Sequence, residues 1–150
     1  METGMNSLIP LLDTAFDLPS RDWSQYSPLT LAYIGDSIYD VIIRTILVKR
    51  ANRPSDVLNR LASRIVCATA QARMISAISP LLDEEETAVY RRGRNSSPAT
   101  KAKNASMHEY LEATGLEALL GYLYLCGRYE RMVFLVREGL ERTGADQAGL

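Results

Sequence analysis

Two acidic residues, Asp36 and Glu117, each interrupt a run of otherwise apolar residues. A glycine precedes each acid closely, with Gly35 directly before Asp36 and Gly115 two residues before Glu117. Glycine inside a helix costs about 1 kcal/mol relative to alanine, so it is expected where another backbone or a ligand must come close. Because burying an unpaired charge is costly, each acid is expected to have a charged, hydrogen-bonding or metal partner.

If the two acids come from different helices, their carboxylates can jointly hold a hard divalent cation such as Mg²⁺, which prefers oxygen ligands. Such a cation polarises a phosphoryl oxygen and activates water. A structural interpretation is equally open here, with both acids bridging to arginines such as Arg44, Arg60 or Arg64. Asp40 follows Asp36 by one helical turn, where it can join the outer shell of a metal or pair with Arg44.

The sequence lacks most of the residues that other kinds of catalytic site require. His108 is the only histidine, which leaves no histidine cluster for a metal and no basis for a Ser-His-Asp triad. Cys67 and Cys126 are the only cysteines, and their helical surroundings favour packing over nucleophilic catalysis. Neither of the glycine-rich phosphate-binding patterns, G-x-x-x-x-G-K-S/T or G-x-G-x-x-G, occurs in the sequence.

Charge is distributed unevenly, although 17 basic and 18 acidic residues give a net charge of only −1. The segment between Thr87 and His108 has no acid, is rich in turn-forming residues, and contains the basic residues Arg91, Arg92, Arg94, Lys101 and Lys103. A basic loop of this kind is a local site for an anion. The alternative is a solvated surface loop that binds nothing.

The elements that would position these residues are helices, because apolar residues recur at helical spacing and no alternating strand pattern appears. Ser27 followed by Pro28 is typical of a helix start. Gly115 marks a site where a helix can break. We therefore expect an all-α protein with helices at 28–49, 55–79, 81–92, 107–125 and 129–143.

Length and composition indicate one globular domain, because 150 residues that are 47% hydrophobic can bury a full core. Two cysteines exclude a disulfide scaffold, and neither a secretory leader nor an apolar run of roughly 20 residues occurs. We expect a soluble, cytoplasmic protein with an N-terminal extension (1–27), a helical domain (28–143) and a C-terminal tail (144–150). Trp23 and Tyr26 would anchor the extension, unless it is a loose arm.

Two segments resemble a known family. The sequence LAYIGDSIYD, residues 31–40, resembles the signature helix of the ribonuclease III catalytic domain, and LEALLGYLYL, residues 116–125, resembles its second catalytic helix. The resemblance extends from about residue 28 to 143, and we expect no double-stranded-RNA-binding domain beside it. This combination is similar to the short Mini-ribonuclease III branch, which the loop 91–95 and Lys103-Asn104 also fit.

The resemblance implies an all-helical homodimer that cuts double-stranded RNA with Mg²⁺, leaving 5′-phosphate and 3′-hydroxyl ends. It implies that Asp36 and Glu117 are the catalytic and metal-binding residues, and that apolar surface on the signature helix forms the dimer interface. The chain departs from the ribonuclease III pattern where Ala32 replaces a glutamate and Thr114 replaces an aspartate. Two fewer carboxylates should weaken metal binding and leave more coordination positions to water and RNA phosphates.

The resemblance also gives the basic loop a role, because duplex RNA is recognised through its phosphates and 2′-hydroxyls. We expect RNA contacts from Arg91, Arg92, Arg94, Asn95, Lys101, Lys103 and Asn104. The implied substrate is the precursor of large-subunit ribosomal RNA, with a ribosomal protein as a candidate helper. The alternative is a catalytically silent module that binds duplex RNA or assists ribosome assembly. A helical phosphohydrolase would need a histidine–aspartate cluster that the sequence lacks.

Overall fold

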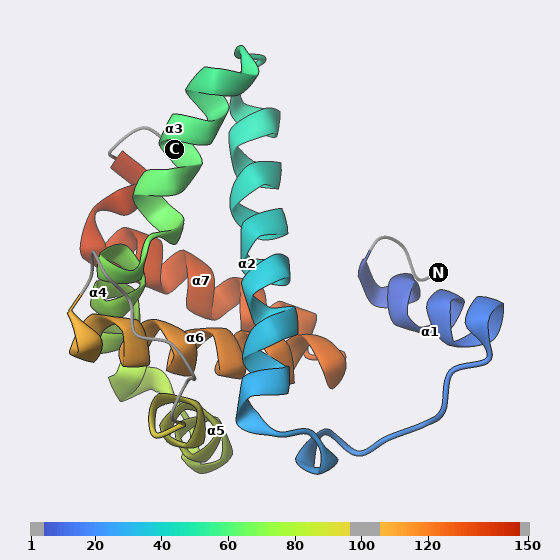
Figure 1. Ribbon diagram of the computed structural model, residues 1–150. Coiled ribbons are helices and arrows are strands. Elements are labelled where there is room, and N and C mark those ends of the chain that lie inside the picture. Colours follow the sequence, from blue (N-terminus) through green and yellow to red (C-terminus); the bar gives the residue numbers. More distant parts are fainter. Residues whose placement is uncertain (1–4, 97–105, 148–150) are drawn as a thin grey trace.

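The computed structural model describes residues 5–96 and 106–147, and within these ranges it contains helices and no strand. The α-helices there are α1 (Met5–Phe16), α2 (Pro28–Arg50), α3 (Ser55–Val66), α4 (Ala68–Ile78), α5 (Glu84–Arg94), α6 (Met107–Leu125) and α7 (Tyr129–Thr143) (Figure 1). Short 3₁₀ turns lie at Trp23–Gln25, Ser79–Leu81 and Ala145–Gln147. The predicted all-α class is confirmed. No helix in the described ranges is long and apolar enough to cross a bilayer.

Helix α6 forms the centre of the core. It is apolar around most of its circumference, so it can be covered on every side. Leu116, Leu119, Leu120 and Leu123 have no exposed surface. Helices α2, α4 and α5 pack directly against α6, while α3 packs along α2 and α7 packs against α4 (Figure 1). This arrangement brings the two segments that carry Asp36 and Glu117 into contact.

Side-chain caps fix the ends of several helices. Ser27 Oγ accepts the backbone N–H of Thr30 at the start of α2, as expected. Asp83 starts α5 with a reciprocal capping box, so this helix begins at Glu84 and not at residue 81. Helix α6 is continuous through Gly115, which contacts a neighbouring helix and causes no break.

The predicted helix at 55–79 is wrong as a single element. Two helices, α3 and α4, meet at Cys67, whose backbone is extended with ψ of 158°. Helix α3 packs on α2, whereas α4 packs on α6 and α7, so the chain must turn between them. The side-chain amide of Gln71 stabilises the turn by donating to the carbonyl of Val66 at 2.8 Å.

The N-terminal extension contains a helix that the sequence patterns did not predict. Helix α1 stands apart from the other helices (Figure 1). Trp23 packs edge-on against the ring of Tyr122, with centroids 4.7 Å apart and planes at 68°. Tyr26 is half-buried against the core. The two aromatic residues thus hold the end of the extension that leads into α2.

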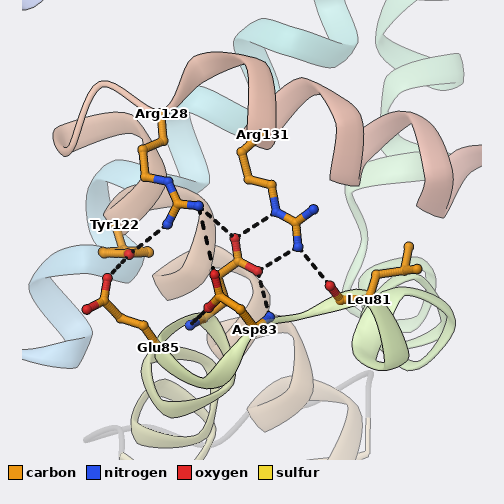
Figure 2. A network of polar contacts seen from close by, with 7 residues as sticks. Leu81, Asp83, Glu85, Tyr122, Arg128 and Arg131 are labelled. Atoms are coloured by element: carbon orange, nitrogen blue, oxygen red, sulfur yellow. Dashed lines mark hydrogen bonds and ion pairs between the residues drawn. The ribbon is translucent and has the colours of Figure 1, made fainter.

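A network of ion pairs joins α5 to α7 (Figure 2). The fully buried Glu86 accepts two hydrogen bonds of 2.8 Å from Arg131, which also donates to the carbonyl of Leu81 at 2.7 Å. Arg128 lies 3.6 Å from Glu86 and donates to the hydroxyl of Tyr122 at 3.0 Å. Burial raises the pKa of Glu86, but the hydrogen bonds and charges around it outweigh burial and lower its pKa. Glu86 is therefore a buried acid that is paired with arginine.

Candidate active site

Helix α2 crosses α6 at a pair of glycines. A Cβ atom at Gly35 would lie 1.7 Å from the carbonyl oxygen of Glu117, and one at Gly121 would lie 2.0 Å from the carbonyl oxygen of Leu31. No side chain fits at either position, so the two backbones are in direct contact. Because Asp36 follows Gly35, the crossing brings Asp36 next to Glu117.

The carboxyl groups of Asp36 and Glu117 lie close enough for Asp36 to act on the pKa of Glu117 through its charge and through a side-chain hydrogen bond. Asp36 is exposed to solvent, while Glu117 is half-buried. Burial, followed by the charge and hydrogen bond of Asp36, raises the pKa of Glu117 to about 8. In the absence of a cation the pair therefore retains a proton at neutral pH, and a divalent cation would take the place of that proton.

Gln71 of α4 is a third polar residue at the pair, and the sequence analysis missed it. The side chain is 2% exposed, and its amide nitrogen donates to Glu117 Oε2 at 3.4 Å as well as to Val66. Its hydrogen bond opposes the larger effects of burial and Asp36 on the pKa of Glu117. An amide within a run of small and apolar residues is the signal that would have identified Gln71.

The structure bears on two alternatives that the sequence left open. Within the described ranges, neither Asp36 nor Glu117 forms an ion pair with an arginine. Asp40 forms an ion pair with Arg44 at 3.1 Å. Asp40 therefore has a structural partner of its own.

The donor set fits a hard divalent cation that keeps most of its water. Carboxyl oxygens from α2 and α6 converge, and these are the ligands that Mg²⁺ prefers. No cluster of three or more His, Cys, Asp or Glu side chains forms in the described part of the chain. Ala32 and Thr114 are each 7% exposed, and the hydroxyl of Thr114 donates to the carbonyl of Tyr110 at 3.0 Å. Two protein carboxylates would therefore leave the remaining positions to water and a phosphate oxygen.

The last turn of α5 packs against the middle of α6. A Cβ atom at Gly93 would lie 2.7 Å from the Cβ of Ala118, the residue after Glu117. Arg91 and Arg92 on this turn are exposed to solvent. The packing of α5 on α6 thus leaves Arg91 and Arg92 exposed on a helix that contacts the segment carrying Glu117.

The other predicted RNA-binding residues divide into two groups. Arg94 is half-buried with its guanidinium 5.4 Å from the centre of the Tyr90 ring, and Asn95 is exposed at the end of α5. Lys101, Lys103 and Asn104 lie outside the described residues.

A second basic segment was also missed at the sequence level. Residues 41–82 contain a single acid, Asp56, against Arg44, Lys49, Arg50, Arg53, Arg60, Arg64 and Arg73. Arg60 and Arg64 are exposed one turn apart on α3. The end of α3 adjoins the carboxyl pair, because Gln71 contacts both Val66 and Glu117. The excess of basic over acidic residues at 41–82 could have identified this segment from the sequence.

A sequence comparison with protein families matches residues 29–128 of this chain to the Ribonuclease III domain. The chain belongs to the ribonuclease III family. The matched range contains both carboxylates of the site and the whole crossing of α2 over α6. Membership in the ribonuclease III family confirms the predicted fold and the predicted enzyme class, an endoribonuclease of the ribonuclease III type.

Individual relatives place the chain within the ribonuclease III family. It is 42% identical over 126 residues to Mini-ribonuclease 3 of Enterococcus faecalis, covering 83% of this chain and 96% of that protein. It is 47% identical over 126 residues to Mini-ribonuclease 3 of Thermoanaerobacter sp., and the match covers 84% of this chain and 89% of that protein. The crystal structure of protein FN1578 from Fusobacterium nucleatum matches with a TM-score of 0.73 and 32% identity. The match covers 79% of this chain and 96% of that chain. The predicted resemblance to the Mini-ribonuclease III branch is confirmed.

Proposed function

We propose that this protein is a Mg²⁺-dependent endonuclease that cuts double-stranded RNA. The observation that carries the proposal is the Asp36–Glu117 carboxyl pair at the glycine crossing, where the pKa of Glu117 is raised to about 8. Two carboxyl groups that crowd each other in this way favour a divalent cation over a proton. The relatives named Mini-ribonuclease 3 support RNA as the substrate.

When bound, Mg²⁺ would polarise a phosphodiester oxygen and lower the pKa of a coordinated water. Asp36 and Glu117 would hold the cation through carboxylate oxygens, and Glu117 must give up its proton to do so. Gln71 keeps the Glu117 carboxylate in place by donating to Oε2. Water attacks the phosphorus and the bond from phosphorus to the 3′ oxygen breaks. The 3′ oxygen takes up a proton from the water and becomes a 3′-hydroxyl, while the phosphate stays on the 5′ oxygen of the next nucleotide.

The basic turn of α5 supports binding of the RNA backbone. Arg91, Arg92 and Asn95 are exposed beside α6, and we assign them to phosphates and 2′-hydroxyls together with Arg94, Lys101, Lys103 and Asn104. Arg60 and Arg64 on α3 are further exposed cations. Such contacts would bind a duplex by its shape and charge.

A homodimer follows from the substrate, because cutting both strands of a duplex takes two carboxyl pairs. The predicted interface on the signature helix is supported by exposed apolar residues on α2, of which Tyr33 is 80% exposed. Leu29, Val41 and Val48 are 42%, 47% and 59% exposed on the same helix. Open apolar surface of this kind is typical of a protein interface.

The substrate we assign is the precursor of large-subunit ribosomal RNA, processed in the cytoplasm. Presentation of that RNA by a ribosomal protein remains a prediction.

The decisive experiment is incubation of the pure protein with duplex RNA labelled on both strands, in Mg²⁺ and in EDTA. We expect fragments with 5′-phosphate ends in Mg²⁺ and intact RNA in EDTA. A silent RNA-binding module is the alternative, since Ala32 and Thr114 replace two family carboxylates. Binding in both buffers with no cleavage in Mg²⁺ would support that module and contradict the proposal.

A further inference from the structure

The side chain of Gln71 buries an oxygen that has no hydrogen-bond partner. The side chain is 2% exposed, and Oε1 contacts no donor in the described part of the chain and has almost no surface open to solvent. Buried polar atoms in folded proteins are nearly always hydrogen-bonded, because an acceptor that loses its water must gain another donor. An exception beside a carboxyl pair indicates a donor that arrives with a ligand.

The contacts of the amide nitrogen fix which way the Gln71 amide points. Nε2 donates to the backbone carbonyl of Val66 at 2.8 Å and to Glu117 Oε2 at 3.4 Å. A backbone carbonyl can only accept a hydrogen bond, so rotating the amide by half a turn would set Oε1 against another oxygen. Oε1 is therefore the atom without a partner, and it needs a donor.

Gln71 and the two carboxyl groups form a short series that runs from solvent into the core. Asp36 is exposed, Glu117 is half-buried and Gln71 is buried. The oxygen and nitrogen of one amide are about 2.3 Å apart, so Oε1 lies within about 6 Å of Glu117 Oε2. Two coordination bonds of about 2.1 Å and one hydrogen bond of about 2.8 Å can span that distance. A water on a cation held by Glu117 is thus within reach of Oε1.

The alternative is that Gln71 serves only the turn between α3 and α4. The bond from Nε2 to Val66 supports that turn, and the contact with Glu117 uses the same nitrogen. Neither contact uses the oxygen. An apolar side chain of similar size would fill the space without burying an unpaired acceptor. The oxygen is therefore the part of Gln71 that the turn does not explain.

We propose that Gln71 is a positioning residue of the cation site, and that its Oε1 accepts a hydrogen bond from a water coordinated to a divalent cation between Asp36 and Glu117. The inference rests on the proposed nuclease and adds a third side chain to its two carboxylates. The carboxyl groups separate to admit the hydrated cation, and this brings a donor to the buried oxygen. Acceptors in the outer shell of a metal orient its ligands and raise its affinity.

Binding of Mn²⁺ to the full chain without RNA, measured by electron paramagnetic resonance, tests this role. Mn²⁺ prefers the same oxygen ligands as Mg²⁺. Q71M removes both the amide donor and the oxygen, whereas Q71E removes the amide donor and keeps an oxygen acceptor. S63A is the control, because it removes a hydrogen bond of the same 2.8 Å length, from the exposed Ser63 of α3 to the carbonyl of Asn59.

The two Gln71 variants should differ in cation binding. The Kd for Mn²⁺ should rise about 10-fold or more in Q71M and keep the wild-type value in S63A. Q71E should bind Mn²⁺ at least as tightly as the wild type, because it keeps the oxygen and adds a negative charge. Both Gln71 variants should have a lower Tm in EDTA, since both lose the bond to Val66.

Each result has a distinct meaning. A wild-type Kd in Q71M overturns the proposal whatever its Tm, because Gln71 then serves only the turn. Weaker binding by Q71E than by the wild type also overturns it, because affinity then follows the amide donor. If one of the two variants does not fold, the other decides against S63A. A wild type that binds no Mn²⁺ overturns the cation site as well, whereas one that binds Mn²⁺ but leaves duplex RNA intact in Mg²⁺ overturns the nuclease alone.

Discussion

The chemistry at the residue scale is that of a buried carboxyl group, Glu117, which lies beside a second carboxyl group, Asp36, and has a raised pKa. Glu117 is desolvated by the packing of α6 and faces Asp36, so its charged form is disfavoured until a cation arrives. Gln71 moderates this effect by donating to Glu117 Oε2. The site is therefore tuned for exchange between a proton and a metal ion, and metal binding should release a proton near neutral pH.

Replacing Glu117 with glutamine should change how the stability of the metal-free protein depends on pH. The folded wild type holds a proton up to about pH 8, whereas the free carboxyl loses it near 4.5. The folded state binds more protons in that window, so the free energy of unfolding falls as pH rises from about 5 to 8. Glu117→Gln lacks this decline and should gain in Tm relative to wild type between pH 6 and pH 9.

Thermal unfolding in EDTA at several pH values measures this difference. Asp40→Asn serves as the control, because it removes a carboxyl from the same site region that is already paired with Arg44. The control should keep the wild-type slope. Parallel curves for wild type and Glu117→Gln would contradict the raised pKa.

The element scale is governed by how closely α2 approaches α6. Gly35→Ala should destabilise the protein by about 3 kcal/mol, because the added methyl would meet the carbonyl oxygen of Glu117. On an open helix the same substitution would stabilise by about 1 kcal/mol, so the sign of the effect is informative. Urea unfolding compares it with Ser37→Ala at an exposed position nearby, where a change within about 0.5 kcal/mol is expected. A stabilising Gly35→Ala would show that the backbones do not touch.

A second prediction at this scale concerns the network between α5 and α7. Arg131→Met should cost about 3–5 kcal/mol, because it leaves the fully buried Glu86 without its bidentate partner. Arg137→Met on the same helix removes an exposed pair with Glu141 and should cost less than about 1 kcal/mol. Chemical denaturation of both variants measures the contrast. Equal losses in the free energy of unfolding would contradict the expectation that the buried pair contributes more than the exposed one.

The sequence correctly predicted those helices whose start or apolar periodicity is encoded within the helix itself. Ser27-Pro28 gave the start of α2, and the span of α7 agrees with its apolar periodicity. The break at Cys67 was not predictable, because it arises from α3 and α4 packing on different neighbours. Gly35 indicated a close approach, but only the fold shows that Glu117 is the partner. Gln71 acquires its role from the same long-range contact.

The distribution of charge over the whole molecule matters more than its sum. The net charge of −1 averages a basic end of α5, a basic segment at 41–82 and an acidic start of α5. The buried Glu86 and the exposed Asp83 neutralise Arg128 and Arg131. The exposed arginines at the end of α5 and on α3 remain available to a phosphate backbone.

Removing two of these charges should change how RNA binding depends on salt. R91A/R92A should weaken binding and reduce the slope of log K against log salt by roughly 2, because each arginine neutralises one phosphate of the RNA. R137A/R142A removes equal charge from α7, where both arginines are paired with glutamates, and should keep the wild-type slope. Fluorescence anisotropy in EDTA measures both. Equal slopes for the two variants would contradict the assignment of the α5 turn.

The carboxyl pair as catalytic centre is tested most directly by single-turnover cleavage of a duplex RNA in Mg²⁺. Asp36→Asn should slow cleavage by about 10³-fold or more, since it removes a ligand of the cation, while RNA binding in EDTA stays at the wild-type level. Asp40→Asn, with the same charge change one turn along α2, should cleave like the wild type. Wild-type cleavage by Asp36→Asn, or equal losses in both variants, would contradict the account.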